Sequence, residues 1–112
     1  MTTIFGKVIR REIPADIVYE DELCLAFRDI NPQAPTHVLV VPKKEIDMLS
    51  NAKAEDQALL GHMMLAACQI ARQLGVGDAF RVVVNNGAEA GQSVFHLHLH
   101  ILAGRKLRWP PG

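Results

Sequence analysis

The stretch Val94-Phe95-His96-Leu97-His98-Leu99-His100-Ile101-Leu102 decides the fold of this chain, because its histidines alternate with aliphatic residues. Successive side chains of a β-strand point to opposite faces of its sheet. The alternation therefore predicts a strand with His96, His98 and His100 on one face, about 6.5–7 Å apart along the strand. The aliphatic residues lie on the other face, which is apolar enough to pack against a hydrophobic core.

Three aligned imidazoles allow three interpretations. They could ligate zinc, although catalytic zinc sites usually recruit a further ligand from another segment, and the nearest acidic residue is Glu89. They could form the solvated face of an edge strand, although three histidines in strict alternation fit that poorly. They could also act in catalysis, because an imidazole nitrogen is a nucleophile and a neighbouring imidazole can orient it or move protons.

The glycine-bearing loop before this stretch favours chemistry on a phosphate. Gly87, Gly91 and Ser93 can place backbone N–H groups around an anion. Asn85 and Gln92 add amide donors, and Ser93 adds a hydroxyl. Donors beside nucleophilic imidazoles suit phosphoryl transfer, in which a site mainly positions groups and stabilises charge.

The composition is that of one globular domain spanning residues 1–112, with 49% apolar and 21% charged residues. A formal net charge of zero gives no electrostatic drive toward a nucleic-acid polymer. No apolar run is long enough to span a membrane, and the segment Met1 to Lys7 does not resemble a signal peptide. Only Cys24 and Cys68 occur, without metal-binding spacing, so we expect reduced thiols and a cytoplasmic location.

Hydrophobic periodicity and chain breakers predict an α+β domain with a five-stranded antiparallel sheet, one long helix and one short helix. Apolar residues at three- and four-residue steps from about Ala54 to Leu74 predict the long helix. Its Met63-Met64 pair is expected in the core, and His62, for which the sequence offers no partner, is expected on the surface. The other expected elements are the short helix Ile4–Arg10, capped by Thr3, a hairpin of strands Ile17–Glu20 and Leu23–Arg28, a central strand Thr36–Val41 and a strand Phe80–Asn85.

The sequence resembles the histidine triad (HIT) superfamily along most of its length. His96–Leu102 matches the pattern His-φ-His-φ-His-φ-φ, in which φ is apolar. The third histidine resembles the hydrolases of the superfamily, since its transferases carry glutamine there. Five further segments resemble the Hint branch, the histidine triad nucleotide-binding proteins: Ile4–Lys7, Phe27–His37, Val41–Lys44, Gly91–Val94 and Trp109–Gly112.

The resemblance implies a HIT-like fold that forms a homodimer with a shared ten-stranded sheet, with Trp109 and the C-terminal tail near the partner subunit. It implies binding of purine nucleotides and hydrolysis of adenosine or guanosine 5′-phosphoramidates to a nucleoside monophosphate and an amine. The family works without a metal or another cofactor. Two alternatives stay open, namely a nucleotide-binding regulator with little turnover and a zinc-binding protein.

The resemblance also assigns roles to residues. His98 corresponds to the nucleophile that carries the nucleotidyl group, and His96, His100 and His37 to its polar surround. We further expect Ser93 to assist the leaving amine. We also expect a backbone carbonyl near His100 to accept a hydrogen bond from the ring nitrogen of His98 that does not attack. The nucleotide-contacting positions are Asn85, Gly91, Gln92, Ser93, His98 and His100 at the phosphate, Asp29 and Ile30 at the nucleoside, and Ile4, Phe5, Val8, Phe27 and Leu39 at the base.

Overall fold

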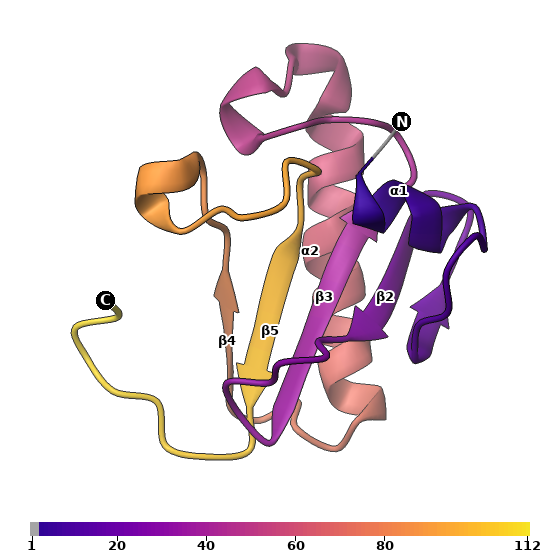
Figure 1. Ribbon diagram of the computed structural model, residues 1–112. Coiled ribbons are helices and arrows are strands. Elements are labelled where there is room, and N and C mark those ends of the chain that lie inside the picture. Colours follow the sequence, from indigo (N-terminus) through magenta and orange to yellow (C-terminus); the bar gives the residue numbers. More distant parts are fainter. Residues whose placement is uncertain (1–2) are drawn as a thin grey trace.

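The protein, seen in a computed structural model that describes residues 3–112, forms one five-stranded antiparallel sheet in the order β1-β2-β3-β5-β4 (Figure 1). The first two strands pair as the predicted hairpin, and β3 is central as predicted, with β2 and β5 as its neighbours. The strands are β1 (Ile17–Glu20), β2 (Cys24–Arg28), β3 (Thr36–Pro42), β4 (Phe80–Val83) and β5 (Leu99–Ala103).

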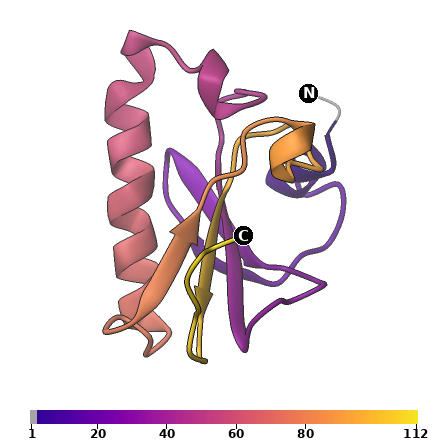
Figure 2. The same cartoon turned by 90° about the vertical axis from the view of Figure 1, so that its left-hand side faces the viewer.

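The two helices lie on opposite faces of the sheet (Figure 2). The long helix α2 (Gln57–Gln73) covers one face, and the short helix α1 (Ile4–Ile9) covers part of the other. Among residues 3–112, no helix is long and apolar enough to cross a membrane. The buried core on the α2 face is formed by Cys24, Ala26, Val38, Val40, Met63, Ala66, Ala67, Ile70, Leu99 and Ile101, and the core on the α1 face by Phe5, Val8, Leu25, Phe27, Leu39 and Val41.

Strand β5 is shorter than the sequence predicts. The strand expected over Val94–Leu102 begins only at Leu99 and ends at Ala103. His96 and His98 precede it, so only His100 lies on the strand, and the three imidazoles do not share one strand face. The alternating aliphatic residues are nevertheless buried as expected, so the pattern indicates burial correctly but misplaces the start of strand pairing.

The early departure from the sheet follows from the residue that ends β3. Pro42 has no N–H and cannot donate a further ladder bond. Its carbonyl oxygen instead accepts a hydrogen bond from Nε2 of His96, at 2.9 Å. The Leu97 N–H donates to the Ile46 carbonyl at 2.7 Å, so this segment is held by a loop instead of a strand.

Helix α2 also starts later than predicted, because Ala54–Asp56 forms a 3₁₀ turn. The Asp56 carboxylate accepts hydrogen bonds from the Lys53 N–H at 2.9 Å and the Lys44 ammonium at 2.5 Å. Such local side-chain bonds compete with regular helical bonding at a helix start.

Within α2 the predicted methionine pair is divided between core and surface. Met63 is buried, whereas Met64 is 48% exposed, because consecutive helix residues point about 100° apart. The other boundaries differ by one or two residues, with α1 ending at Ile9, β2 starting at Cys24, β3 reaching Pro42 and β4 ending at Val83. The predicted cap is confirmed, since the Thr3 side chain accepts from the Gly6 N–H at 3.1 Å.

Candidate active site

A cavity of about 290 Å³ lies on the α1 face of the sheet. Its volume is close to the lower end of the range of about 300–1,000 Å³ found for small-molecule sites. Every residue predicted to contact the base or the nucleoside lies in its lining. The lining consists of Ile4, Phe5, Val8, Ile13, Pro14, Ala15, Phe27, Arg28, Asp29, Ile30, Leu39, Ser93, Val94, His98 and His100.

Aromatic rings connect the apolar part of this cavity to the histidines. Phe5 and Phe27 pack edge to face, with ring centroids 5.4 Å apart. Phe5 also meets the His98 ring edge to face, at 4.9 Å and 87°. Helix α1 therefore contributes to the site, because its Phe5 ring packs against one side of the His98 imidazole.

The His98 side chain is held in one tautomer. Its Nδ1–H donates to the His96 carbonyl at 2.7 Å, so Nε2 carries the lone pair. Within the described part of the chain, Nε2 has no hydrogen-bond partner, and the ring lines the cavity. The carbonyl that fixes the tautomer belongs to His96, so the expectation of a carbonyl near His100 is wrong.

A chain of hydrogen bonds fixes the His37 and His100 rings in the same way. The Gln33 N–H donates to Nδ1 of His37 at 3.0 Å, so the proton of the His37 ring is on Nε2. That N–H donates to Nδ1 of His100 at 2.9 Å, which leaves the His100 proton on Nε2. In the cavity, His98 thus presents a lone pair and His100 an N–H donor.

Asp29 lies beside this chain of hydrogen bonds, next to His37. One carboxylate oxygen accepts from the Asn31 N–H at 2.9 Å, and the other lies 3.4 Å from Nε2 of His37. A carboxylate offers about four lone-pair positions, so Asp29 keeps acceptor capacity toward the cavity that it lines.

His96 is placed differently from the other two motif histidines. Its ring is buried beside the cavity, where Nε2–H donates to Pro42 and Nδ1 accepts from the Thr3 hydroxyl at 3.4 Å. The ring does not line the cavity. His96 contributes to the site through its backbone carbonyl, which accepts the hydrogen bond from Nδ1–H of His98.

The loop from Asn85 to Ser93 is folded around the Gln92 side chain. The Gln92 carbonyl oxygen accepts from the Gly87 N–H at 2.8 Å, and its amide N–H groups donate to the Asp47 and Val94 carbonyls at 2.8 and 3.1 Å. This amide is therefore occupied within the protein. Of the loop positions predicted to contact phosphate, only Ser93 lines the cavity, and its hydroxyl has no partner within residues 3–112.

Gly91 and Asn85 lie against each other at the far side of this loop. Gly91 has a positive φ of 101°, which favours glycine, and a Cβ there would be 3.6 Å from Nδ2 of Asn85. Neither residue lines the cavity.

Burial keeps the site histidines neutral. Desolvation lowers the pKa values of His37, His96 and His98. Desolvation, followed by repulsion from the protonated forms of His98 and His37, lowers the pKa of His100 to about 4. The lone pair on His98 is thus available at neutral pH, which nucleophilic attack requires.

Comparison with known proteins identifies the family, because residues 10–107 match the HIT domain. The chain belongs to the HIT family. An uncharacterized HIT-like protein from Synechocystis is 68% identical over 110 residues, 98% of this chain and 96% of that protein. A 14 kDa zinc-binding protein from Zea mays is 52% identical over 112 residues, 98% of this chain and 88% of that protein.

Solved structures confirm the HIT fold. A HIT family hydrolase from Legionella pneumophila has a TM-score of 0.95 and 44% identity, with 97% of this chain and 98% of that chain covered. A histidine triad protein from Clostridium difficile has a TM-score of 0.92 and 46% identity, with 96% and 95% covered. The predicted superfamily and single-subunit fold are therefore confirmed.

We expect this HIT domain to lose stability as the pH falls from about 7 to about 5. Unfolded histidines bind protons near pH 6.5, whereas the buried histidines have lowered pKa values, so the unfolded state binds more protons in this range. The stabilisation is present above about pH 6.5 and is lost toward pH 4, the pKa of His100. Urea unfolding at both pH values measures it, and His100→Gln should reduce the difference. Equal free energies of unfolding at pH 7 and pH 5 would contradict this expectation.

Two groups of residues in the described HIT domain could hold a metal ion. Asp29, His37 and His100 lie in the candidate site, and Asp21, Cys24 and His62 lie elsewhere. In the first group, a ring nitrogen of His37 is already hydrogen-bonded to a ring nitrogen of His100. Within residues 3–112, His96, His98 and His100 do not form one group of potential metal ligands. Their alternation in the sequence therefore does not place them around one metal ion.

Gln33 is the site residue of the HIT domain that sequence reasoning missed. Gln33 acts through its backbone N–H, and it sets the His37 tautomer. Every residue except proline has such an N–H, so the residue type gives no indication of this role. The only available signal was its place in the loop fixed by Pro32 and Pro35. The lining residues Ile13, Pro14 and Ala15 were missed as well, because nothing in their spacing separates them from ordinary loop residues, and Arg28 and Val94 were expected only as strand residues.

Proposed function

We propose that this protein is a purine nucleoside phosphoramidase, which hydrolyses the P–N bond of adenosine or guanosine 5′-phosphoramidates. The observation that carries the proposal is the His98 ring, whose Nδ1–H is donated to a backbone carbonyl while its neutral Nε2 lines a cavity. A hydrolase of the same family, from Legionella pneumophila, shares the fold at 44% identity and supports a hydrolytic activity.

In the first step Nε2 of His98 attacks phosphorus opposite the amine. A P–Nε2 bond forms, the P–N bond to the amine breaks, and the amine takes a proton that the Ser93 hydroxyl passes on from solvent. The His96 carbonyl stabilises the positive charge on the ring, because Nδ1–H keeps donating to it. The N–H of His100 is suited to donate to a phosphate oxygen, where negative charge accumulates.

In the second step water attacks the same phosphorus. The P–Nε2 bond breaks, the nucleoside monophosphate is released, and the neutral His98 imidazole is restored after the water has lost a proton. The two displacements are similar chemistry, and the residues described supply a nucleophile and hydrogen-bond donors for both.

The form of the cavity supports a mononucleotide as ligand. Phe5, Phe27 and Leu39 give one part of it an apolar lining that suits a purine. Asp29 lines the same cavity, and its carboxylate can accept from ribose hydroxyls. A volume of about 290 Å³ suits one nucleotide better than a polymer.

Turnover of adenosine 5′-phosphoramidate in excess chelator tests this function. We expect AMP and ammonia to form at the same rate with and without chelator, since His98 and His100 do the chemistry. Binding of AMP without measurable turnover would favour the regulatory alternative. Turnover that chelation abolishes and zinc restores would favour a metal enzyme.

We also propose that the protein is a homodimer. Trp109 is 80% exposed, with the Arg81 guanidinium 6.0 Å from its ring centroid, and Leu65 on α2 is 73% exposed. Large exposed apolar side chains of this kind are expected to be covered by a partner. Sedimentation equilibrium at micromolar concentration should give twice the chain mass, and Trp109→Ala should weaken the association. A monomer under these conditions would refute the proposal.

A further inference from the structure

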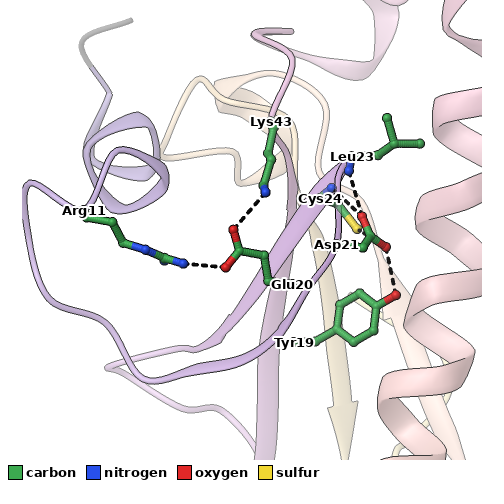
Figure 3. Close-up of polar contacts among 7 residues, drawn as sticks. All are labelled: Arg11, Tyr19, Glu20, Asp21, Leu23, Cys24 and Lys43. Atoms are coloured by element: carbon green, nitrogen blue, oxygen red, sulfur yellow. Dashed lines mark hydrogen bonds and ion pairs between the residues drawn. The ribbon is translucent and has the colours of Figure 1, made fainter.

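A second cluster of reactive side chains lies at the turn between β1 and β2. Oδ2 of Asp21 accepts from Nε2 of His62 at 2.6 Å, from the Tyr19 hydroxyl at 2.8 Å and from the Cys24 thiol at 3.7 Å. Figure 3 shows the Asp21 carboxylate between the Tyr19 hydroxyl and the backbone N–H groups of Leu23 and Cys24. His62 was expected only as a surface histidine with no partner apparent in the sequence, and its partner in the fold is Asp21, because α2 brings His62 to the hairpin turn.

This cluster is separate from the nucleotide cavity. Along β2, Cys24 and Ala26 point into the core under α2, whereas Leu25 and Phe27 point into the core under α1. The cavity is on the α1 face, so the sheet lies between Cys24 and the cavity. His62 comes from α2 and reaches the cluster from that same side.

The ligand atoms of Asp21, Cys24 and His62 all lie within 4.8 Å of one another. They supply one carboxylate oxygen, one sulfur and one imidazole nitrogen, from a turn, a strand and a helix. Three such ligands with water in the fourth position make a tetrahedral zinc site. The sulfur and nitrogen donors disfavour Mg²⁺ and Ca²⁺, which prefer oxygen alone.

We propose that Asp21, Cys24 and His62 form a site for a thiophilic divalent metal ion of the zinc class. The site goes beyond the proposed hydrolase function and is independent of it. Because the site lies at the contact between the hairpin and α2, a bound ion would tie these two elements together.

The local hydrogen bonds leave room for such an ion. Oδ1 of Asp21 holds the N–H groups of Leu23 at 2.8 Å and Cys24 at 2.9 Å, and it can keep both. Oδ2 would exchange its bonds to His62 and Cys24 for the ion. The proton on Nε2 of His62 would move to Nδ1, and the thiol proton would be released to solvent.

The three ligands of the cluster differ in their exposure to solvent. The Cys24 side chain is fully buried, whereas the side chains of His62 and Asp21 are 36% and 23% exposed. An ion would therefore meet the carboxylate and the imidazole first and the sulfur last. Burial, followed by the Asp21 charge, raises the pKa of the Cys24 thiol to about 12, so only a metal that binds sulfur strongly would displace its proton.

Titration with Co²⁺ tests the site, since cobalt substitutes for zinc and gives a thiolate-to-cobalt charge-transfer band that imidazoles and carboxylates cannot give. We expect one equivalent of Co²⁺ per chain with this band, removed by excess Zn²⁺. Cys24→Ser should abolish the band, and His62→Ala should weaken binding by about a hundredfold or more. Cys68→Ser is the matched control, because this second cysteine lies on α2 outside the cluster, and it should leave the band unchanged.

A second measurement separates this site from the histidines of the cavity. Titration of His98→Ala should give the same band and the same affinity as the wild type. Thermal unfolding should show a rise in Tm with Zn²⁺ in the wild type and in Cys68→Ser but not in folded Cys24→Ser. Absence of the band, or its persistence in Cys24→Ser, would overturn the proposal and leave the cluster as a hydrogen-bonded link. Neither result would bear on turnover of phosphoramidates, so the two proposals fail separately.

Discussion

Replacing His98 with alanine should reduce phosphoramidate turnover by several orders of magnitude while nucleotide affinity changes by less than about tenfold. The attacking lone pair is lost, and within residues 3–112 no other ring presents one to the cavity, because Nε2 of His100 carries a proton. The affinity should be nearly kept, since the lost contact is one ring among many lining residues. A tenfold change corresponds to about 1.4 kcal/mol. Single-turnover kinetics and AMP binding by calorimetry measure the two quantities.

The covalent intermediate provides an independent test of the same assignment. Wild-type protein quenched rapidly without acid should carry a nucleotidyl mass on the peptide that contains His98, with the modification on that residue. His98→Ala should carry none. Because His98 also packs on Phe5, circular dichroism and Tm of the variant should be compared with the wild type. A label on His96 or His100, or comparable turnover in folded His98→Ala, would contradict the assignment.

Replacing Ser93 with alanine should slow substrates with poor leaving groups by about a hundredfold to ten-thousandfold, the usual contribution of a positioned proton donor. Ser93 lines the same cavity as His98, and its hydroxyl has no partner within the described part of the chain, so it is available to a departing amine. Substrates with an acidic leaving group need no proton and should be affected far less. The ratio of kcat/KM for alkyl and aryl phosphoramidates measures the difference.

Two comparisons make the Ser93 result specific. Ser93→Thr keeps a hydroxyl and should retain most of the activity on alkyl phosphoramidates. Ser50→Ala, a second exposed serine that does not line the cavity, should leave both substrates unaffected. An equal loss for both leaving groups in Ser93→Ala would reduce this residue to a binding role.

Most of the fold could be predicted from the sequence because hydrophobic spacing reflects burial. The hairpin, the central strand and the long helix were predicted close to their observed bounds. Errors occurred where a non-local contact outweighed the pattern. Val94 to His98 alternates like a strand, yet the proline that ends β3 leaves it without a pairing partner, and the His96 ring takes the free carbonyl.

The sequence by itself determined which residues are candidates for the chemistry, since the spacing of His96, His98 and His100 and the neighbouring loop are properties of residue types and their order. Only the tertiary structure decided what each imidazole does. A ring tautomer depends on which carbonyl or N–H lies within hydrogen-bond distance, and the partners of His37 and His98 come from Gln33 and the His96 backbone. The cluster around Asp21 could not be predicted from the sequence either. Asp21 and His62 are 41 positions apart, and only the packing of α2 on the sheet brings them together.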